Sequence, residues 1–251
     1  MKALITGASS GIGKEMAYYL ASLGHDLILV ARREEILKEI QSKVKTNVKV
    51  ISLDLEREEN VYKLYELTKD DNIDMLINNA GFGLFGFTSD TSLEKELAMI
   101  NLNIKALHIL TKLYLKDMMK KNSGYILNVG SSAGFLAGPK LNTYYATKNY
   151  VVKFTLGLYE ELNKQKSNVH VSVLCPGPVD TEFNKVAGGY FNVGSKTPKY
   201  VAKKAIDKTL KNKLIIIPGL SVKLAIFLNR FIPYKLSLKF AYLVQNRKTR
   251  K

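Results

Sequence analysis

The 251-residue sequence contains a single cysteine, Cys175, and only three histidines. One cysteine excludes an internal disulfide framework and fits a reducing compartment. His25, His108 and His170 share no metal-ligand spacing, so we expect no metal site. No stretch reaches the roughly 20 uninterrupted apolar residues of a membrane span. The sequence opens on a strand-like run, residues 2–6, and we expect no signal peptide and a cytoplasmic location.

Acidic residues are scarce at one end of the chain. The formal net charge is +16, and from Lys199 onward fourteen Lys and Arg face one acid, Asp207, which leaves +13 there. The first 198 residues are nearly balanced, so the cationic character belongs to the tail. Apolar residues make up 46% and charged residues 24%, as in an ordinary globular protein long enough to bury a large core.

Strand and helix patterns alternate along the first two hundred residues, including one long helix from about Ser92 to Met118. Short connections between such elements imply parallel strands joined by helical crossovers. We predict an α/β fold: one doubly wound (Rossmann) domain over residues 1–220, with a substrate loop at 182–197. Residues 221–251 form a basic amphipathic helical tail of the same domain. The mostly parallel sheet has seven predicted strands, at Lys2–Thr6, Leu27–Ala31, Val48–Leu53, Met75–Ile77, Tyr125–Val129, Val169–Leu174 and Leu214–Ile217.

Glycines punctuate the junction between the first strand and the first helix, at Gly7, Gly11 and Gly13. Residues without a side chain let the backbone approach a pyrophosphate, and the helix amino terminus offers it N–H groups and partial positive charge. Glycines also make ordinary turns, so the triplet alone is weak. Its position after a strand and before a helix favours a dinucleotide site.

The end of the second strand indicates which dinucleotide is bound. An Asp or Glu there would accept bonds from the 2′-hydroxyl of the cofactor ribose. The chain instead has Arg32 and Arg33, whose guanidinium groups suit a 2′-phosphate. Glu34 and Glu35 follow, and at a helix start they serve the helix dipole. The sequence therefore favours NADP, and NADPH over NADH; the alternative is that both arginines are merely solvated.

Tyr144 lies four residues before Lys148 within an apolar-periodic run. In a helix, the phenol and the ammonium group share one face, one turn apart. A nearby positive charge favours the phenolate, so we predict that Lys148 lowers the pKa of Tyr144 toward neutral pH, where a tyrosine can exchange protons. Tyr–Lys pairs at this spacing also occur by chance on surface helices. Whether this pair is catalytic is therefore judged from the other motifs of the chain.

Four motifs, taken together, carry a family resemblance across roughly residues 1 to 220. They are TGASSGIG at residues 6–13, NNAG at 78–81, YYATK at 144–148 and PGPVDT at 176–181. In this order and on these elements they resemble the short-chain dehydrogenases/reductases, in the branch of about 250 residues. The resemblance implies a Rossmann fold, a nicotinamide cofactor and hydride transfer.

The resemblance also implies catalytic roles for Asn101, Ser131, Tyr144 and Lys148. Ser131 would hydrogen-bond the substrate oxygen; Ser132 competes for this role, and the spacing to Tyr144 favours Ser131. Tyr144 would be the acid or base. Asn101 would hold a water behind Lys148 through its backbone carbonyl, and Asn103 is the neighbour that could be mistaken for it.

Cofactor contacts follow from the same motifs. By resemblance, Asp54 would contact the adenine, Val179 and Thr181 the carboxamide, and Lys148 the nicotinamide ribose. The full set of expected cofactor-binding residues is Gly7, Ser9, Ser10, Gly11, Ile12, Gly13, Arg32, Arg33, Asp54, Leu55, Asn79, Ala80, Gly81, Tyr144, Lys148, Pro176, Gly177, Val179 and Thr181.

These features predict an NADP(H)-dependent oxidoreductase of a carbonyl or secondary alcohol, acting mainly as a reductase. The alternative is a non-catalytic dinucleotide-binding sensor or scaffold, which would not need the complete catalytic set. Apolar loop residues predict an apolar or lipid-like substrate, although aromatics at loops often serve packing. Gly188 and Gly189 suggest a lid in the loop 182–197. The expected pocket residues are Phe82, Leu84, Phe85, Phe87, Phe135, Leu136, Phe183 and Phe191.

The tail leaves several partners open. Residues 221–230 and 234–244 carry apolar residues at helical spacing with Lys and Arg between them. Such helices pack on their own domain or on a second subunit of a homodimer or homotetramer. They can also lie on an anionic membrane, here the inner face of the cell membrane. Nucleic-acid binding is unlikely, because charge alone is weak evidence for it.

Overall fold

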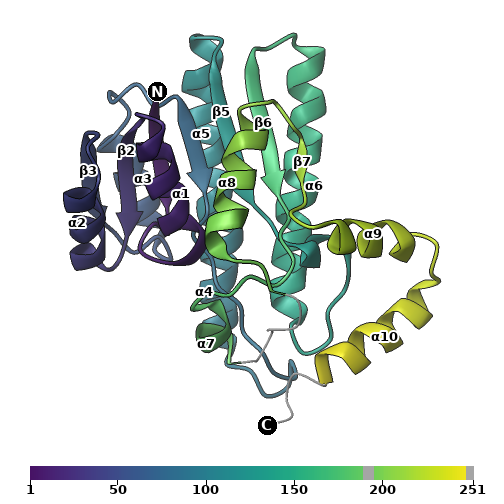
Figure 1. The fold of residues 1–251 in the computed structure, drawn as a ribbon. Coiled ribbons are helices and arrows are strands. Elements are labelled where there is room, and N and C mark those ends of the chain that lie inside the picture. Colours follow the sequence, from purple (N-terminus) through teal and green to yellow (C-terminus); the bar gives the residue numbers. More distant parts are fainter. Residues whose placement is uncertain (189–194, 247–251) are drawn as a thin grey trace.

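Seven parallel strands form one sheet in the order β3-β2-β1-β4-β5-β6-β7, in a computed structural model that describes residues 1–188 and 195–246 (Figure 1). The order reverses after β1, because the chain returns to the centre of the sheet to place β4 beside it. The predicted doubly wound fold is confirmed. The strands are β1 (Lys2–Thr6), β2 (Asp26–Ala31), β3 (Val48–Ser52), β4 (Met75–Asn78), β5 (Gly124–Val129), β6 (Val169–Leu174) and β7 (Ile215–Ile216).

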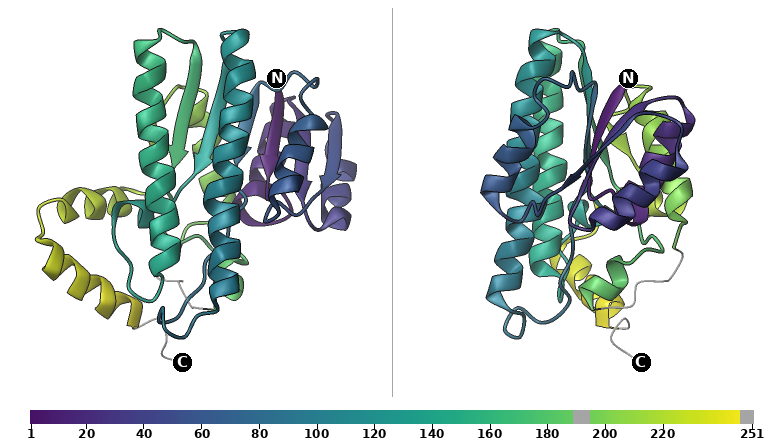
Figure 2. Two further views of the ribbon diagram at one scale, coloured as in Figure 1. Left: turned by 180° about the vertical axis from the view of Figure 1, so that it is seen from behind. Right: turned by 90° about the vertical axis from the view of Figure 1, so that its left-hand side faces the viewer.

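Helices cover both faces of the sheet, as the edge-on view in Figure 2 shows. Alternate strand residues point to opposite faces. In β1, Ala3 and Ile5 pack with one set of helices, and Leu4 packs with the other. The first face is covered by α1 (Gly11–Ser22), α2 (Glu34–Lys43) and α8 (Pro198–Thr209), and the second by α3 (Glu58–Glu66), α5 (Leu107–Lys120) and α6 (Asn142–Lys164).

The long helix predicted from Ser92 to Met118 is not a uniform α-helix. It consists of α4 (Leu93–Ile100), a π-helical segment at Asn101–Ala106, and α5. Short π segments are rare and concentrate at functional sites. Here the wider turn lies beside α6, the helix that carries Tyr144 and Lys148.

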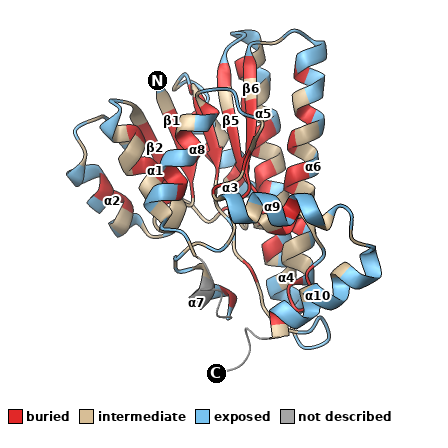
Figure 3. Ribbon diagram, turned by 45° about the vertical axis from the view of Figure 1, so that its right-hand side comes forward, coloured by how far each residue is buried: buried red, intermediate tan, exposed pale blue. Residues whose placement is uncertain are grey.

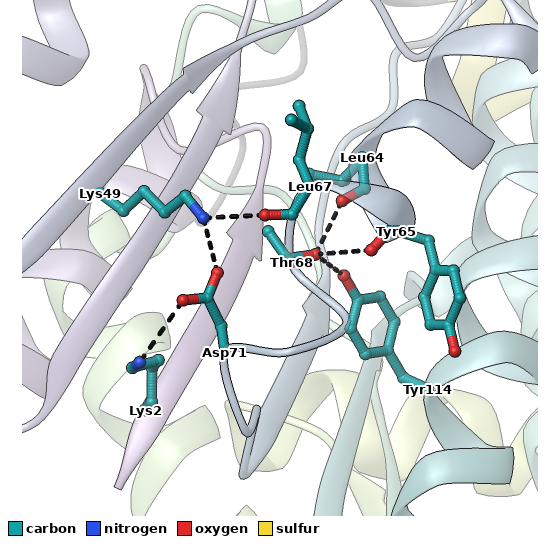
Figure 4. Close-up of polar contacts among 8 residues, drawn as sticks. All are labelled: Lys2, Lys49, Leu64, Tyr65, Leu67, Thr68, Asp71 and Tyr114. Atoms are coloured by element: carbon teal, nitrogen blue, oxygen red, sulfur yellow. Dashed lines mark hydrogen bonds and ion pairs between the residues drawn. The ribbon is translucent and has the colours of Figure 1, made fainter.

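A polar cluster fastens the end of α3 to the rim of the sheet (Figure 4). Asp71 forms ion pairs with Lys2 and Lys49, at Nζ–O distances of 3.7 and 2.7 Å. The Thr68 hydroxyl bonds the carbonyl of Leu64 and the buried phenol of Tyr114. Lys2 begins β1, so this cluster lies at the amino ends of the strands. The glycine turn and the other predicted site motifs follow the carboxyl ends of the strands, at the opposite edge of the sheet.

Shorter elements complete the carboxyl side. They are a 3-10 turn at Ser132–Phe135, α7 (Phe183–Ala187), α9 (Leu220–Asn229) and α10 (Tyr234–Asn246). Figures 1 and 2 show α9 and α10 extending from the body as a hook whose end returns toward the loops below α6. Most residues of this hook are exposed (Figure 3).

Candidate active site

A cleft of about 920 Å³ lies across the carboxyl ends of the strands. This is where open parallel sheets bind ligands, near the reversal of strand order. All but two of the predicted site residues line it; the exceptions are Gly13 and Asn101. The lining residues that the sequence predicted are Gly7, Ser9, Ser10, Gly11, Ile12, Arg32, Arg33, Asp54, Leu55, Asn79, Ala80, Gly81, Ser131, Tyr144, Lys148, Pro176, Gly177, Val179 and Thr181.

Three positions of the turn between β1 and α1 and of the start of α1 have no room for a side chain. Gly7 has φ +66°, and a Cβ there would lie 2.8 Å from the Cα of Ala80. Gly11 has φ +52°, and a Cβ would meet the Thr181 side chain at 3.0 Å across the cleft. Gly13 sits behind the turn, where a Cβ would overlap the Asn79 amide. These residues form a cradle open to a pyrophosphate at a helix amino terminus, which fits a dinucleotide.

Thr6 joins this turn to the end of β4. Its hydroxyl accepts the backbone N–H groups of Asn79 and Ala80, both at 3.0 Å. The Asn79 amide donates to the carbonyls of Thr6 and Gly7 at 2.9 and 3.1 Å. These hydrogen bonds therefore hold the two motifs against each other at the floor of the cleft, which Gly7, Asn79 and Ala80 line.

Both arginines line the cleft next to the end of β2, and each already has an acidic partner. Arg32 Nη1 lies 3.0 Å from Glu56 Oε1 and 3.9 Å from Asp54 Oδ2. Arg33 Nη2 lies 2.9 Å from Glu182 Oε2 and 3.4 Å from Ser9 Oγ. A 2′-phosphate would have to compete with these carboxylates. The sequence did not single out Glu56 or Glu182, because neither belongs to a motif.

Ser131, Tyr144 and Lys148 meet at the other end. The Ser131 side chain lies beside the Tyr144 phenol, and its Oγ accepts from the N–H of Ala133 at 3.1 Å. Lys148 is buried, donates from Nζ to the Val129 carbonyl at 2.8 Å, and lies 5.8 Å from the centre of the Tyr144 ring. Ser132, the alternative serine, also lines the cleft, and its N–H donates to the Pro176 carbonyl.

The pKa values of this cluster differ from the prediction. Burial raises the pKa of Tyr144 above its ordinary value, and the Ser131 hydrogen bond offsets this only in part. Burial also lowers the pKa of Lys148 to about 8. The prediction that Lys148 lowers the pKa of Tyr144 is therefore wrong for the cleft as it stands. The physical reason is that burial disfavours the charged phenolate, while the Lys148 ammonium group donates to the Val129 carbonyl.

The asparagine beside Lys148 is Asn103 and not Asn101. Asn101 is exposed, whereas Asn103 is 1% exposed and bonds both the N–H and the carbonyl of Phe82. Its amide also donates to Thr147 Oγ1 at 3.1 Å. Helical spacing in the sequence could have found it, since Met99, Asn103 and Leu107 are buried and lie four residues apart, whereas Asn101 falls half a turn away.

Aromatic and aliphatic side chains line the cleft around Tyr144. Phe82, Leu84 and Phe183 line the cleft, with Phe183 5.2 Å from Tyr144 between ring centres. Phe85 packs behind them, and Phe87 lies at the surface over Lys140. Phe135 belongs to a core cluster and, with Leu136, does not line the cleft. Leu141 and Tyr145 do, and the sequence did not predict them. Phe191 and Gly189, with the predicted lid, lie outside the described residues.

Comparison with known proteins defines the class. The family model of the short chain dehydrogenases matches residues 1–188. The chain therefore belongs to the short-chain dehydrogenases. This confirms the prediction of a short-chain dehydrogenase/reductase enzyme. In the described part of the chain, no group of three His, Cys, Asp or Glu could hold a metal ion.

Three proteins of known sequence or structure are similar to this chain over most of their length. An uncharacterized oxidoreductase of Staphylococcus saprophyticus is 37% identical over 185 residues, which cover 71% of this chain and 78% of that protein. An NADP-dependent 3-hydroxy acid dehydrogenase of Schizosaccharomyces pombe is 33% identical over 231 residues, covering 85% and 88%. A short-chain dehydrogenase from Sphingobium yanoikuyae, solved in complex with NADPH, has 31% identity and a TM-score of 0.81, covering 87% and 88%.

Proposed function

We propose that this protein is an NADPH-dependent reductase of an apolar carbonyl compound. The observation that carries the proposal is one continuous cleft with two arginines at one end and the Ser131–Tyr144 pair beside a buried Lys148 at the other. The names of the Schizosaccharomyces pombe and Sphingobium yanoikuyae proteins, which include NADP and NADPH, support the choice of cofactor. A sensor or scaffold would not need this catalytic cluster.

The cofactor residues fit the group from end to end. The turn at Gly7–Ile12 would cradle the pyrophosphate, Arg32 and Arg33 the 2′-phosphate, and Asp54 with Leu55 the adenine. Asn79, Ala80 and Gly81 would lie along the central part, and Pro176, Gly177, Val179 and Thr181 would hold the nicotinamide. Gly13 supports this surface from behind.

Residues of the chain would complete the chemistry. Bound NADPH supplies a hydride to the carbonyl carbon, and negative charge develops on the carbonyl oxygen. Ser131 and Tyr144 donate hydrogen bonds to that oxygen, and the Tyr144 hydroxyl gives it a proton. The raised pKa of Tyr144 keeps this proton in place until it is needed. Lys148 then supplies positive charge next to the phenolate.

We assign the supporting asparagine role to Asn103. Its side chain fixes the backbone at Phe82, and a Cβ on Gly81 would lie 2.8 Å from Asn103 Oδ1 and 3.5 Å from Lys148 Nζ. Asn103 and the ammonium group that it would help to orient therefore both lie next to Gly81.

The substrate end favours a molecule with an apolar body. Phe82, Leu84, Leu141, Phe183 and Val186 surround the space next to Tyr144. Burial of apolar surface contributes roughly 25 cal/mol per Å², so an alkyl or ring body gains affinity there that a sugar would not. The predicted homodimer or homotetramer stays a prediction.

The experiment is a screen of NADPH oxidation at 340 nm against aliphatic ketones, cyclic ketones, aldehydes, 3-oxo esters and sugars. We expect turnover that rises with the apolar size of the carbonyl compound, with 3-oxo esters included because of the relative from Schizosaccharomyces pombe. Turnover of sugars only would overturn the apolar pocket. Tight NADPH binding without turnover of any class would favour the sensor.

A further inference from the structure

An apolar stripe runs along the outer side of each helix of the hook. On α9 and the turn that follows it, Leu220, Leu224, Phe227 and Phe231 recur at helical spacing and are 85, 57, 52 and 72% exposed. The opposite side of α9 faces the domain, where Ile226 is buried. On α10 the exposed apolar residues include Leu236, Phe240, Leu243 and Val244, and Tyr234, Leu238 and Tyr242 are exposed beside them.

Every charged side chain on the hook is cationic. Lys223 and Arg230 flank the stripe of α9, and Lys235 and Lys239 flank that of α10. Residues 219–246 contain no Asp or Glu, and none of these four cations has an ion pair among the described residues. Apolar stripes bordered by free lysines are typical of helices that lie in a membrane interface.

The inner sides of the same helices hold the hook in place. Val222 packs on Gly177, where an added Cβ would lie 2.7 Å from its Cγ2. Ser237 donates to Asn229 Oδ1 at 2.7 Å, which joins α10 to α9. At the end of α10, buried Gln245 donates to the Tyr145 hydroxyl at 2.7 Å. The outer stripes are therefore not needed for these attachments.

We propose that the outer surface of α9 and α10 binds an anionic lipid bilayer, lying flat in its interface. No helix of the described part of the chain is long and apolar enough to cross a membrane, so the helices rest on the surface. A second copy is a poorer occupant, because a twofold interface brings each patch against itself. Four unpaired cations from each copy would then repel one another.

The bilayer would lie close to the substrate end of the cleft. Tyr145 lines the cleft, is bonded by Gln245, and neighbours Tyr144 at 6.2 Å between ring centres. Lys140, near the same loops, donates to Asn246 Oδ1 at 2.7 Å. The binding surface itself does not depend on the proposed reaction.

The test is flotation of the full chain with vesicles of phosphatidylcholine alone or mixed with phosphatidylglycerol. We expect binding to the mixed vesicles and little to the neutral ones. The variant Lys223→Glu/Lys235→Glu/Lys239→Glu should lower the partition coefficient on the order of 100-fold, since each lysine near an anionic surface contributes about 1 kcal/mol. The matched control is Lys112→Glu/Lys116→Glu/Lys153→Glu, exposed residues of α5 and α6 with the same change in net charge, which should bind as the unmodified chain does.

A second variant separates the occupants. Leu224→Ser/Phe231→Ser removes exposed apolar side chains and should also weaken vesicle binding while NADPH binding stays unchanged. Failure of the unmodified chain to float with anionic vesicles would overturn the proposal. An equal loss of vesicle binding in the control variant would also overturn the proposal, because binding would then depend on net charge and not on the hook. A dimer in sedimentation that Leu224→Ser/Phe231→Ser dissociates, without vesicle binding, would assign the surface to a second copy.

Discussion

The two ends of the cleft are built in different ways. At the cofactor end, backbone groups and short side chains such as Thr6 and Asn79 bond one another at strand termini. At the substrate end, side chains from α6, α7 and the loop after β4 meet through ring contacts such as Tyr144 with Phe183. The first end is held by hydrogen bonds that involve backbone groups, whereas the second depends on the packing of apolar rings. Substitutions should therefore affect the two ends differently.

The largest effect should come from Tyr144→Phe, which removes the proton donor and keeps the ring that packs on Phe183. We expect turnover to fall by a factor of ~10²–10⁴, with NADPH affinity nearly unchanged because the ring and cleft remain. Steady-state rates and a fluorescence titration of bound NADPH measure the two quantities. Retained turnover would remove Tyr144 from its proposed role.

At the other end, Arg32→Glu should weaken NADPH by roughly 10- to 100-fold, since hydrogen bonds to charged groups are worth about 1.5–3 kcal/mol. NADH should be affected far less, because it has no 2′-phosphate. The matched variant Glu56→Gln frees Arg32 from its carboxylate partner and should strengthen NADPH binding. Equal losses of both cofactors in Arg32→Glu would contradict the phosphate site.

The variants Asn103→Ala and Asn101→Ala test which asparagine supports Lys148. Loss of Asn103 leaves the N–H and the carbonyl of Phe82 without their partner, which should lower the free energy of unfolding by about 1–3 kcal/mol and reduce turnover through Lys148. Asn101 is exposed, so its removal should change neither. Urea unfolding and turnover of both variants provide the check. A larger effect from Asn101→Ala than from Asn103→Ala would contradict the assignment of the supporting role to the Asn103 side chain.

The smallest effect concerns pH. The pKa of Lys148 is about 8 in the folded chain against 10.5 for an ordinary lysine. Between these values the unfolded chain binds more protons, so the free energy of unfolding should rise as pH increases through this window. Lys148→Met removes the titrating group, so its unfolding free energy should lack that rise in urea titrations at about pH 7 and about pH 9.5. An identical pH dependence in both proteins would contradict the lowered pKa of the buried Lys148 ammonium group.

Most of the fold followed from sequence because hydrophobic periodicity reports burial directly. The strands and the glycine turn are local patterns, and their order implied a parallel sheet. The long predicted helix hid the π-helical segment, since a change from α to π leaves the apolar pattern almost intact. The role of Asn101 came from resemblance alone and stays a prediction, whereas the buried face of the same helical segment carries Asn103.

Other features depend on contacts between distant segments. Arg33 meets Glu182 across 149 positions, and Gln245 meets Tyr145 across 100. Neither pair can be predicted from the spacing of residues within one segment of the sequence. The pKa of Tyr144 was misjudged for a related reason: the sequence shows the nearby charge, but the degree of burial that opposes it depends on the whole substrate end.

The most direct measurement is a crystal structure of the chain with NADPH and a ketone inhibitor. The account predicts the nicotinamide beside the Tyr144 hydroxyl, with the inhibitor oxygen within hydrogen-bond distance of Tyr144 and Ser131. It also predicts Arg32 or Arg33 on the 2′-phosphate, released from Glu56 or Glu182. A nicotinamide bound elsewhere, with the Tyr144 hydroxyl turned away from it, would contradict the account.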